Sequence, residues 1–69
     1  MYVLRLQEKI TSHRGNLNRH KEIEFLVKWL GFDESDNSWE PYSQLRDSEQ
    51  LHAYLLENNL QRLIPKKFR

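Results

Sequence analysis

The stretch that decides the fold reads FLVKWLGFDESDNSWEP and spans residues 25–41. It holds two tryptophans, Trp29 and Trp39, with a Gly-Phe corner and a cluster of acidic residues between them. Because the chain has only 69 residues and no cysteine, no disulfide or thiolate-bound metal supports its small core. A few large side chains must therefore supply that core, and each tryptophan can bury a large apolar area.

The charges are unevenly distributed, although the formal net charge is only +1. Residues 33–49 hold six acidic residues and one basic residue, whereas the remainder holds ten basic and four acidic residues. Such an asymmetry is typical of a surface that faces a partner, while any single charge is explained more simply by a solvated loop. No apolar run reaches the length of a membrane span, so no membrane partner is expected.

Three segments have the residue pattern of β-strands. Residues 3–10 alternate, and their apolar side holds Leu4, Leu6 and Ile10. Residues 22–30 are rich in β-branched and aromatic side chains, and one face of this segment holds Ile23, Phe25, Val27 and Trp29. A third, short strand is predicted at residues 38–40. Pro41 ends it, because proline has no N–H to donate to a neighbouring strand.

The other segments predict a loop and a helix. Residues 12–21 are polar, tolerate turn conformations and are predicted to form a long hairpin loop. Asp47 is predicted to be the N-cap of a helix, with Gln50 as its capping-box partner. Apolar residues follow at helical spacing, namely Leu51, Tyr54, Leu55 and Leu56. Asn58 and Asn59 are stop signals, a further turn is predicted around residues 60–64, and the basic tail after Pro65 is expected to fray.

These elements predict an α+β fold, a small, curled three-stranded antiparallel sheet packed against one C-terminal helix. Three strands alone leave one apolar face exposed to water, and the helix can cover it. Residues 1–69 are predicted to form a single domain. Its core is expected over about residues 4–58, and residues 59–69 are expected to form a helix extension and a basic tail.

The motif Phe-Leu-Val-Lys-Trp-Leu-Gly-Phe at residues 25–32, followed by Asn-Ser-Trp-Glu-Pro at residues 37–41, resembles the chromodomain family. Glu-Lys-Ile at residues 8–10 is similar to the first strand of that family. The first motif and the segment Leu-Ile-Pro-Lys-Lys at residues 63–67 resemble chromodomains at the C-terminus of long-terminal-repeat (gypsy-type) retrotransposon integrases. On this resemblance, the chain is expected to be a domain excised from a larger polyprotein.

The resemblance implies that the chain reads a methylated lysine on a histone tail. In this family the tail binds as an added strand, and three aromatic side chains hold the methylammonium group by cation–π attraction. Trp29 and Phe32 match two of these cage aromatics, and Asp36 matches the acidic residue beside the cation. Gln44 matches an asparagine that bonds the peptide backbone, and Trp39 matches a tryptophan of the core. The implied partner is a histone tail, that of histone three, and the implied location is the nucleus.

Two positions depart from the family pattern. Arg5 stands where the family has its first cage tyrosine, and Gln7 stands where it has a valine, so a positive charge opposes the ligand. A one-residue bulge would bring two leucines to these places, or Tyr2 would fold back to complete the cage. The peptide groove is predicted to lie between residues 2–8 and 41–45. The residues expected to line it are Leu4, Arg5, Leu6, Gln7, Asp36, Tyr42 and Gln44.

Two other binding functions stay open. Basic residues of the loop and the tail predict a weak contact with the phosphates of DNA or RNA, and these residues are Arg14, Arg19, Lys21, Lys66 and Lys67. The apolar stripe of Leu56, Leu60, Leu63 and Ile64 would suit self-association, although the same residues would equally close the core. A monomer is expected rather than a dimer.

The sequence has no arrangement typical of an active site. His13, His20 and His52 lack metal-ligand spacing, and no nucleophile with a base or phosphate-binding glycine loop can be identified. We therefore expect a binding module without catalytic residues, metal or cofactor, and not an enzyme.

Overall fold

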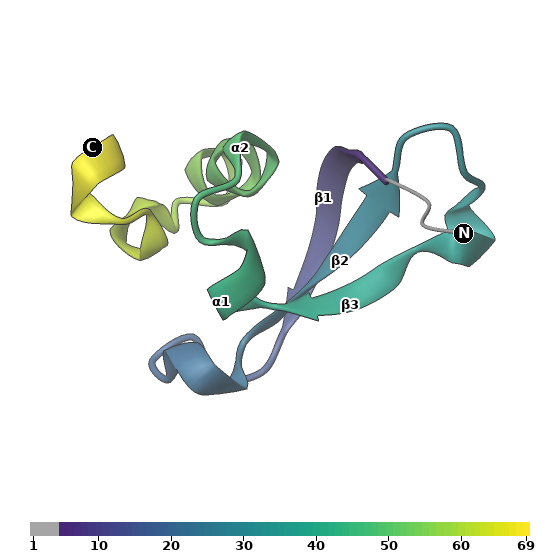
Figure 1. Ribbon diagram of the computed structural model, residues 1–69. Coiled ribbons are helices and arrows are strands. Elements are labelled where there is room, and N and C mark those ends of the chain that lie inside the picture. The colour runs from purple at the N-terminus through teal and green to yellow at the C-terminus, as the bar shows by residue number, and fades with distance from the viewer. Residues whose placement is uncertain (1–4) are drawn as a thin grey trace.

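The computed structural model describes residues 5–69, so the expected roles of Tyr2 and Leu4 lie outside the described residues. The chain forms one antiparallel sheet with the strand order β1-β2-β3. Its strands are β1 (Gln7–Arg14), β2 (Glu24–Trp29) and β3 (Ser38–Pro41). Figure 1 shows the sheet as a curled ribbon, with the two α-helices and the C-terminal segment gathered at one side of it. The predicted α+β fold, a three-stranded sheet with a C-terminal helix, is confirmed.

Two α-helices and four short 3-10 helices complete the described part of the chain. The α-helices are α1 (Tyr42–Leu45) and α2 (Glu49–Glu57). The 3-10 helices are η1 (His20–Glu22), η2 (Glu34–Asp36), η3 (Gln61–Leu63) and η4 (Lys66–Phe68). The helix α2 packs against β1. None of these helices is long and apolar enough to cross a membrane.

The strand β1 differs from the prediction because two irregularities interrupt its pairing with β2. They lie between Gln7 and Lys9 and between Ile10 and Ser12. Each bulge adds a residue to one strand and changes the face to which the following side chains point. Strict alternation therefore fails. Ile10 is buried, whereas Leu6, expected on the same apolar side, is 57% exposed, and the strand continues to Arg14.

The core is organised around Phe25, which is fully buried on the central strand. The ring of Phe25 lies 6.1 Å from the ring of Tyr54 on α2 and 6.4 Å from the ring of Tyr42 on α1, measured between centroids. The other buried apolar residues of this cluster are Ile10, Ile23, Val27, Leu45, Leu51, Leu55, Leu60, Leu63 and Ile64. The buried side chains on the predicted apolar face of β2 and those at helical spacing in α2 thus lie in one core.

The C-terminal segment closes the core instead of presenting an apolar stripe. Leu60, Leu63 and Ile64 are buried, and only Leu56 of the suggested dimer stripe is exposed. Beyond Pro65, in the basic tail, residues 66–68 form the 3-10 helix η4. Phe68 in η4 packs its ring 4.8 Å from the ring of His52, measured between centroids.

Trp39 does not belong to the core, contrary to the expectation. On β3 it pairs with Leu26, which alternates with the buried Phe25 and Val27 and so faces away from them. Trp39 is half-buried, and the guanidinium carbon of Arg14 lies 4.2 Å from its ring centroid. Arginine stacked on tryptophan therefore covers part of the sheet face opposite Phe25 and Val27.

Ser48, not Asp47, is the N-cap of α2. Its side-chain oxygen accepts a hydrogen bond of 3.2 Å from the backbone N–H of Leu51. Both residues are good caps, and the choice between them is decided by tertiary structure, because the Ser48 hydroxyl also donates to Oε1 of Gln7 at 2.7 Å. At the other end, Asn59 has a positive φ of 59°, which agrees with its role as a stop signal.

The turn after β1 depends on Gly15, and this generates a first prediction. Gly15 has a φ of +98°, and a Cβ built there would lie 1.9 Å from the carbonyl oxygen of Glu22. Gly15→Ala should therefore lower the free energy of unfolding by about 3 kcal/mol or more. Gly31→Ala is the matched control, because Gly31 has a φ of +81° with nothing within 4 Å of the new Cβ, and should cost about 1 kcal/mol. Urea unfolding of both variants measures this, and equal losses would contradict the steric argument.

Tyr54 generates a second prediction, about stability at high pH. Burial raises the pKa of its hydroxyl above the usual value of 10.0. The folded state thus favours the neutral phenol, so this contribution is complete below pH 10 and is lost as the pH rises through the raised pKa. Stability measured by urea unfolding between pH 8 and pH 11 should fall more steeply in the wild type than in Tyr54→Phe. Parallel pH profiles for the two proteins would show that the argument is wrong.

Candidate functional site

Trp29 lies at the end of β2 and is held in place by β3. Its ring is half-buried against the core. The indole N–H donates a hydrogen bond of 2.9 Å to the hydroxyl of Ser38, which in turn donates to Oε2 of Glu40 at 2.7 Å. Because the Ser38 oxygen is positioned by its own partner, this relay fixes the orientation of the indole ring. Sequence reasoning missed the role of Ser38, since only strand pairing brings it beside Trp29.

The face of Trp29 carries a cation in this structure. The guanidinium carbon of Arg5, an exposed residue, lies 4.3 Å from the centroid of the Trp29 ring. This is the geometry of a cation–π contact, which contributes about 0.5–1 kcal/mol at an exposed site. Arg5, expected to oppose a ligand cation near the cage, thus lies directly on the ring face that such a cation would use.

A second aromatic and several acidic side chains follow Trp29 at the same corner. Gly31 adopts a left-handed conformation, and the backbone N–H of Phe32 donates to the Trp29 carbonyl at 3.1 Å, which makes a tight turn. Phe32 is 38% exposed, so part of its ring is accessible to solvent. Asp36 lies in the 3-10 helix η2 and is exposed. The corner therefore combines exposed aromatic surface with negative charge.

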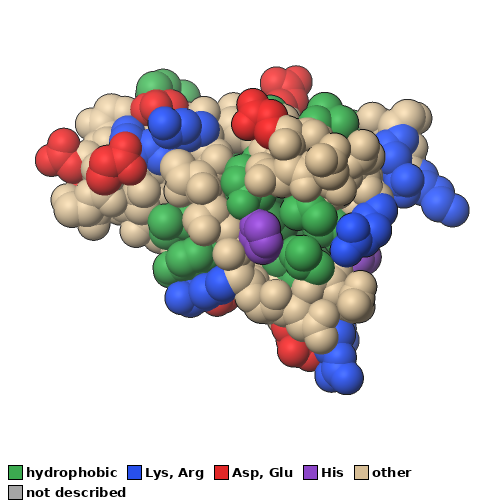
Figure 2. Space-filling model, turned by 180° about the vertical axis from the view of Figure 1, so that it is seen from behind, with side chains coloured by type: hydrophobic (Ala, Val, Ile, Leu, Met, Phe, Trp, Pro, Cys, Tyr) green, Lys and Arg blue, Asp and Glu red, His purple; other side chains and the backbone are tan. Residues whose placement is uncertain are grey.

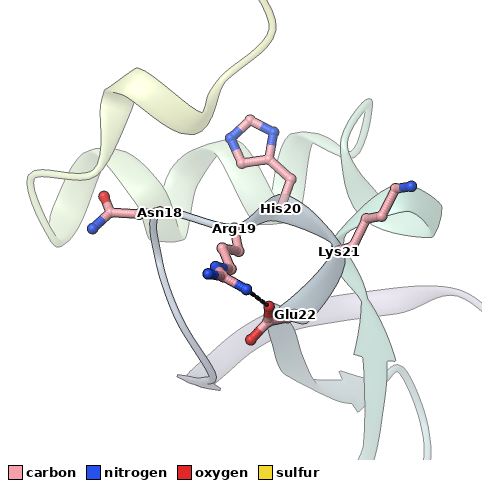
Figure 3. Close-up of a pocket in the computed structure, with 5 residues that line it drawn as sticks. All are labelled: Asn18, Arg19, His20, Lys21 and Glu22. Carbon is pink, nitrogen blue, oxygen red and sulfur yellow. Dashed lines mark hydrogen bonds and ion pairs between the residues drawn. The ribbon is translucent and has the colours of Figure 1, made fainter.

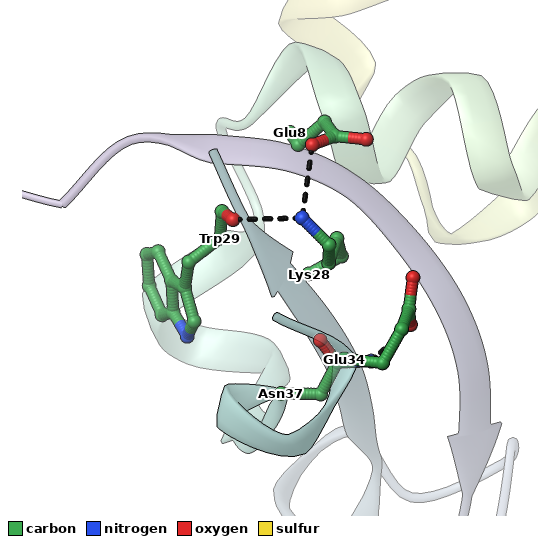
Figure 4. Close-up of polar contacts among 5 residues, drawn as sticks. All are labelled: Glu8, Lys28, Trp29, Glu34 and Asn37. Atoms are coloured by element: carbon green, nitrogen blue, oxygen red, sulfur yellow. Dashed lines mark hydrogen bonds and ion pairs between the residues drawn. The ribbon is translucent and has the colours of Figure 1, made fainter. Parts of the chain in front are cut away.

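The backbone of this corner is anchored from the opposite face of β2. Figure 4 shows Lys28 and Trp29 on opposite sides of the strand. The ammonium group of Lys28, a residue with 9% exposure, donates to Oε1 of Glu8 at 3.0 Å and to the Trp29 carbonyl at 3.0 Å. The pair joins the start of β1 to the end of β2, so the segment that carries Arg5 leaves the sheet from a defined point.

A hollow of about 490 Å³ lies between the start of β1 and the start of α2. Its lining consists of Arg5, Leu6, Gln7, Leu30, Ser48 and Gln50. Leu6 and Leu30 are both more than half exposed, and the Leu30 N–H donates to the Leu6 carbonyl at 2.7 Å. The hollow thus has an apolar wall, and the hydrogen bond between Ser48 and Gln7 bridges its two sides.

The residues expected in the peptide groove are only partly brought together. Arg5, Leu6 and Gln7 line the hollow, but Gln44 lies exposed on α1 and is not part of its lining. Tyr42 is 8% exposed and donates its hydroxyl to the carbonyl of Leu63, so it belongs to the core and offers no free ring to a peptide. Its apolar ring fills the space between β2 and η3, which sequence spacing alone does not reveal.

The basic residues proposed to contact phosphates divide into two sets. Arg14 forms a 2.8 Å ion pair with Glu24, Arg19 a 3.2 Å pair with Glu22, and Lys67 a 3.6 Å pair with Asp47. The other two, Lys21 and Lys66, line hollows near α1. Arg69 of the basic tail lines the same hollow as Lys66, and so do Arg46 and Arg62, which the sequence pattern did not single out.

No metal site is found in the described part of the chain, where no three His, Asp or Glu side chains are grouped to hold an ion. The Nδ1 atom of His13 already has a hydrogen-bond partner, the Tyr54 hydroxyl, at 2.6 Å. The surface features that remain are an aromatic, acidic corner and basic hollows, which are suited to binding charged partners.

A small curled sheet with one covering helix and an exposed aromatic corner defines a binding module of the chromodomain class. The chromo (chromatin organisation modifier) domain family matches residues 8–57, and the chain belongs to this family. The chain is 48% identical over 40 residues to histone-lysine N-methyltransferase SUV39H1-A of Danio rerio, covering 56% of this chain and 10% of that protein.

Two further relatives are similar over the same module. Chromobox protein homolog hpl-2 of Caenorhabditis elegans is 52% identical over 48 residues, which cover 68% of this chain and 26% of that protein. Chromatin-associated protein SWI6 of Cryptococcus neoformans is 39% identical over 46 residues, 67% of this chain and 19% of that protein. The chain therefore spans about a quarter or less of these curated relatives. No solved structure matches it.

Proposed function

We propose that the chain binds a histone tail, reads a methylated lysine on it and thereby tethers a larger protein to chromatin in the nucleus. The observation that carries this proposal is the Trp29 ring, oriented by Ser38 and already in contact with a cation. Membership of the chromodomain family and the names of two relatives, a chromatin-associated protein and a histone-lysine methyltransferase, support the same partner.

The physical basis is the difference between a methylated and an unmodified ammonium group. Trimethylation removes the N–H donors, so the cation can leave water without losing hydrogen bonds and is attracted to aromatic faces. In the proposed site, Trp29 and Phe32 supply the aromatic surface, and Asp36 supplies negative charge. Tyr2 remains a candidate for the third wall.

The peptide is proposed to lie as an added strand in the hollow between residues 5–7 and the start of α2. Backbone hydrogen bonds would give affinity, and the apolar wall of Leu6 and Leu30 would accept a small side chain. The bond between Gln7 and Ser48 crosses this hollow, so it has to open when the peptide enters. Arg5 likewise has to leave the Trp29 face.

The wider context is proposed from sequence resemblance alone. The segments at residues 25–29 and 63–67 support a chromodomain of a retroelement integrase, excised from a polyprotein that it directs to chromatin. Histone three is proposed as the histone whose tail is read.

A titration tests the reader function. Histone-three tail peptides, trimethylated or unmodified at the heterochromatin-mark lysine, are added while NMR follows the Trp29 indole and the amides of Phe32 and Asp36. The trimethylated peptide should bind about fivefold tighter or more, from two aromatic contacts of about 0.5–2 kcal/mol each. Phe32→Ala should remove most of this preference, and Phe68→Ala, an equally apolar exposed site at the far end of the chain, should keep it. If neither peptide shifts the Trp29 indole, the proposed function is wrong.

A further prediction concerns Arg5 as a competitor for the same ring. Arg5→Ala should bind the trimethylated peptide about two- to fivefold tighter, because no contact of about 0.5–1 kcal/mol has to be broken. Arg5→Lys is the control, since it keeps a positive charge near Trp29 and should stay close to the wild type. Isothermal calorimetry at one salt concentration measures all three. Weaker binding by Arg5→Ala would mean that Arg5 helps to hold the peptide.

A further inference from the structure

A second concave surface lies at the other end of β2, beside η1. Two hollows of about 260 Å³ each adjoin there and share His20, Tyr42 and Arg46 in their lining. The remaining basic side chains that line them are Lys21, Arg62, Lys66 and Arg69. No aspartate or glutamate lines either hollow. We call this surface the basic groove, and it is separate from the Trp29 corner.

The floor of the basic groove is fixed by the core. The Tyr42 hydroxyl donates to the Leu63 carbonyl and so joins α1 to η3. On the far side, His52 Nε2 lies at hydrogen-bonding distance, 2.7 Å, from the Arg46 carbonyl and packs its ring against Phe68. The segment that carries Lys66 and Arg69 is therefore docked onto the domain, and cations from four parts of the chain converge on one surface.

The cations of the groove are largely free of acidic partners. Within residues 5–69, no carboxylate lies within ion-pair distance of Lys21, Arg62 or Lys66, and Arg46 faces Asp47 only at 3.9 Å, with both side chains more than half exposed. Figure 3 shows that His20 and Lys21 point to the opposite side of the loop from the paired Arg19 and Glu22. Seen from behind in Figure 2, Lys and Arg side chains gather at the end of the molecule that carries the C-terminal segment. Such a cluster attracts polyanions.

We propose that the basic groove binds single-stranded nucleic acid, with phosphates along the cations and a base stacked on His20. Arginine presents a planar set of donors that matches a phosphate group, and three arginines line the groove. The His20 side chain is exposed, and its ring lies 5.0 Å from the Tyr42 ring between centroids, so a rigid aromatic surface backs it. An acidic peptide would satisfy the cations but would make no use of this ring, whereas a nucleobase stacks on it.

The test measures fluorescence anisotropy of labelled single strands of about 12 nucleotides with the whole chain, using RNA and DNA of one base sequence. Arg62→Ala combined with Lys66→Ala should weaken binding about tenfold and lower the slope of log affinity against log salt by about 1.4, the loss of two phosphate contacts. Arg19→Ala combined with Lys67→Ala is the matched control, because it removes the same charge from paired cations. The control should lose about twofold at most. His20→Ala should weaken binding about fivefold or more with an unchanged salt slope.

Each alternative outcome decides the proposal. Equal losses in the groove variant and the charge-matched control would overturn it in favour of diffuse attraction. Tighter binding of a duplex, or equal competition by a glutamate-rich peptide of the same charge, would overturn it as well. Equal affinity for RNA and DNA supports backbone and base recognition, and a preference for RNA supports it with an added contact to the 2′-hydroxyl. Urea unfolding and far-UV circular dichroism of the groove variants should match the wild type, which shows that they are folded.

Discussion

The packing of α1 and α2 onto Phe25 is the interaction on which the rest of the structure depends. The chain has no cysteine, and the buried apolar residues within residues 5–69 form one cluster, which contains the fully buried ring of Phe25 on the central strand. Tyr42 and Tyr54 approach this ring from two helices. Phe25 and Val27 of β2 are buried, and a candidate binding surface lies beside each end of the strand.

The sheet face opposite Phe25 and Val27 is partly covered by an arginine side chain, which sequence patterns do not reveal. Trp39 lies on the sheet face away from Phe25, and Arg14 lies on its ring, just as Arg5 lies on Trp29. Arg14 is also paired with Glu24, whereas Arg5 has no ion pair among the described residues. The Arg14 contact is therefore built into the sheet by cross-strand pairing. The Arg5 contact depends on a single exposed side chain, so a ligand can displace it at little cost.

Much of the fold could be predicted because β2 and α2 follow regular hydrophobic periods. The face of Phe25 and Val27 and the helical spacing of Leu51 and Leu55 led directly to the core. The bulges of β1 leave no comparable signature, so Leu6 was expected inside and lies exposed. The N-cap was misplaced by one residue because Asp47 and Ser48 have similar local propensity, and the distant Gln7 is an added partner of Ser48. The short α1 and the burial of Tyr42 likewise follow from tertiary contacts.

The two candidate sites also differ in how far they could be predicted from the sequence. The Trp29 corner is nearly continuous in sequence, so its aromatic and acidic residues could be identified beforehand, whereas the position of Arg5 on the ring could not. The basic groove is assembled from η1, the end of α1, η3 and η4. Two of its arginines, Arg46 and Arg62, are more than 15 positions apart in the sequence, so their proximity could not be predicted. The two surfaces have opposite charge and lie at opposite ends of β2. On the two proposals above, a basic histone tail would be attracted to the acidic corner and repelled by the groove, and a nucleic acid would have the reverse preference. Since chromatin presents both kinds of polymer side by side, electrostatics would direct each to its own end of the domain without competition.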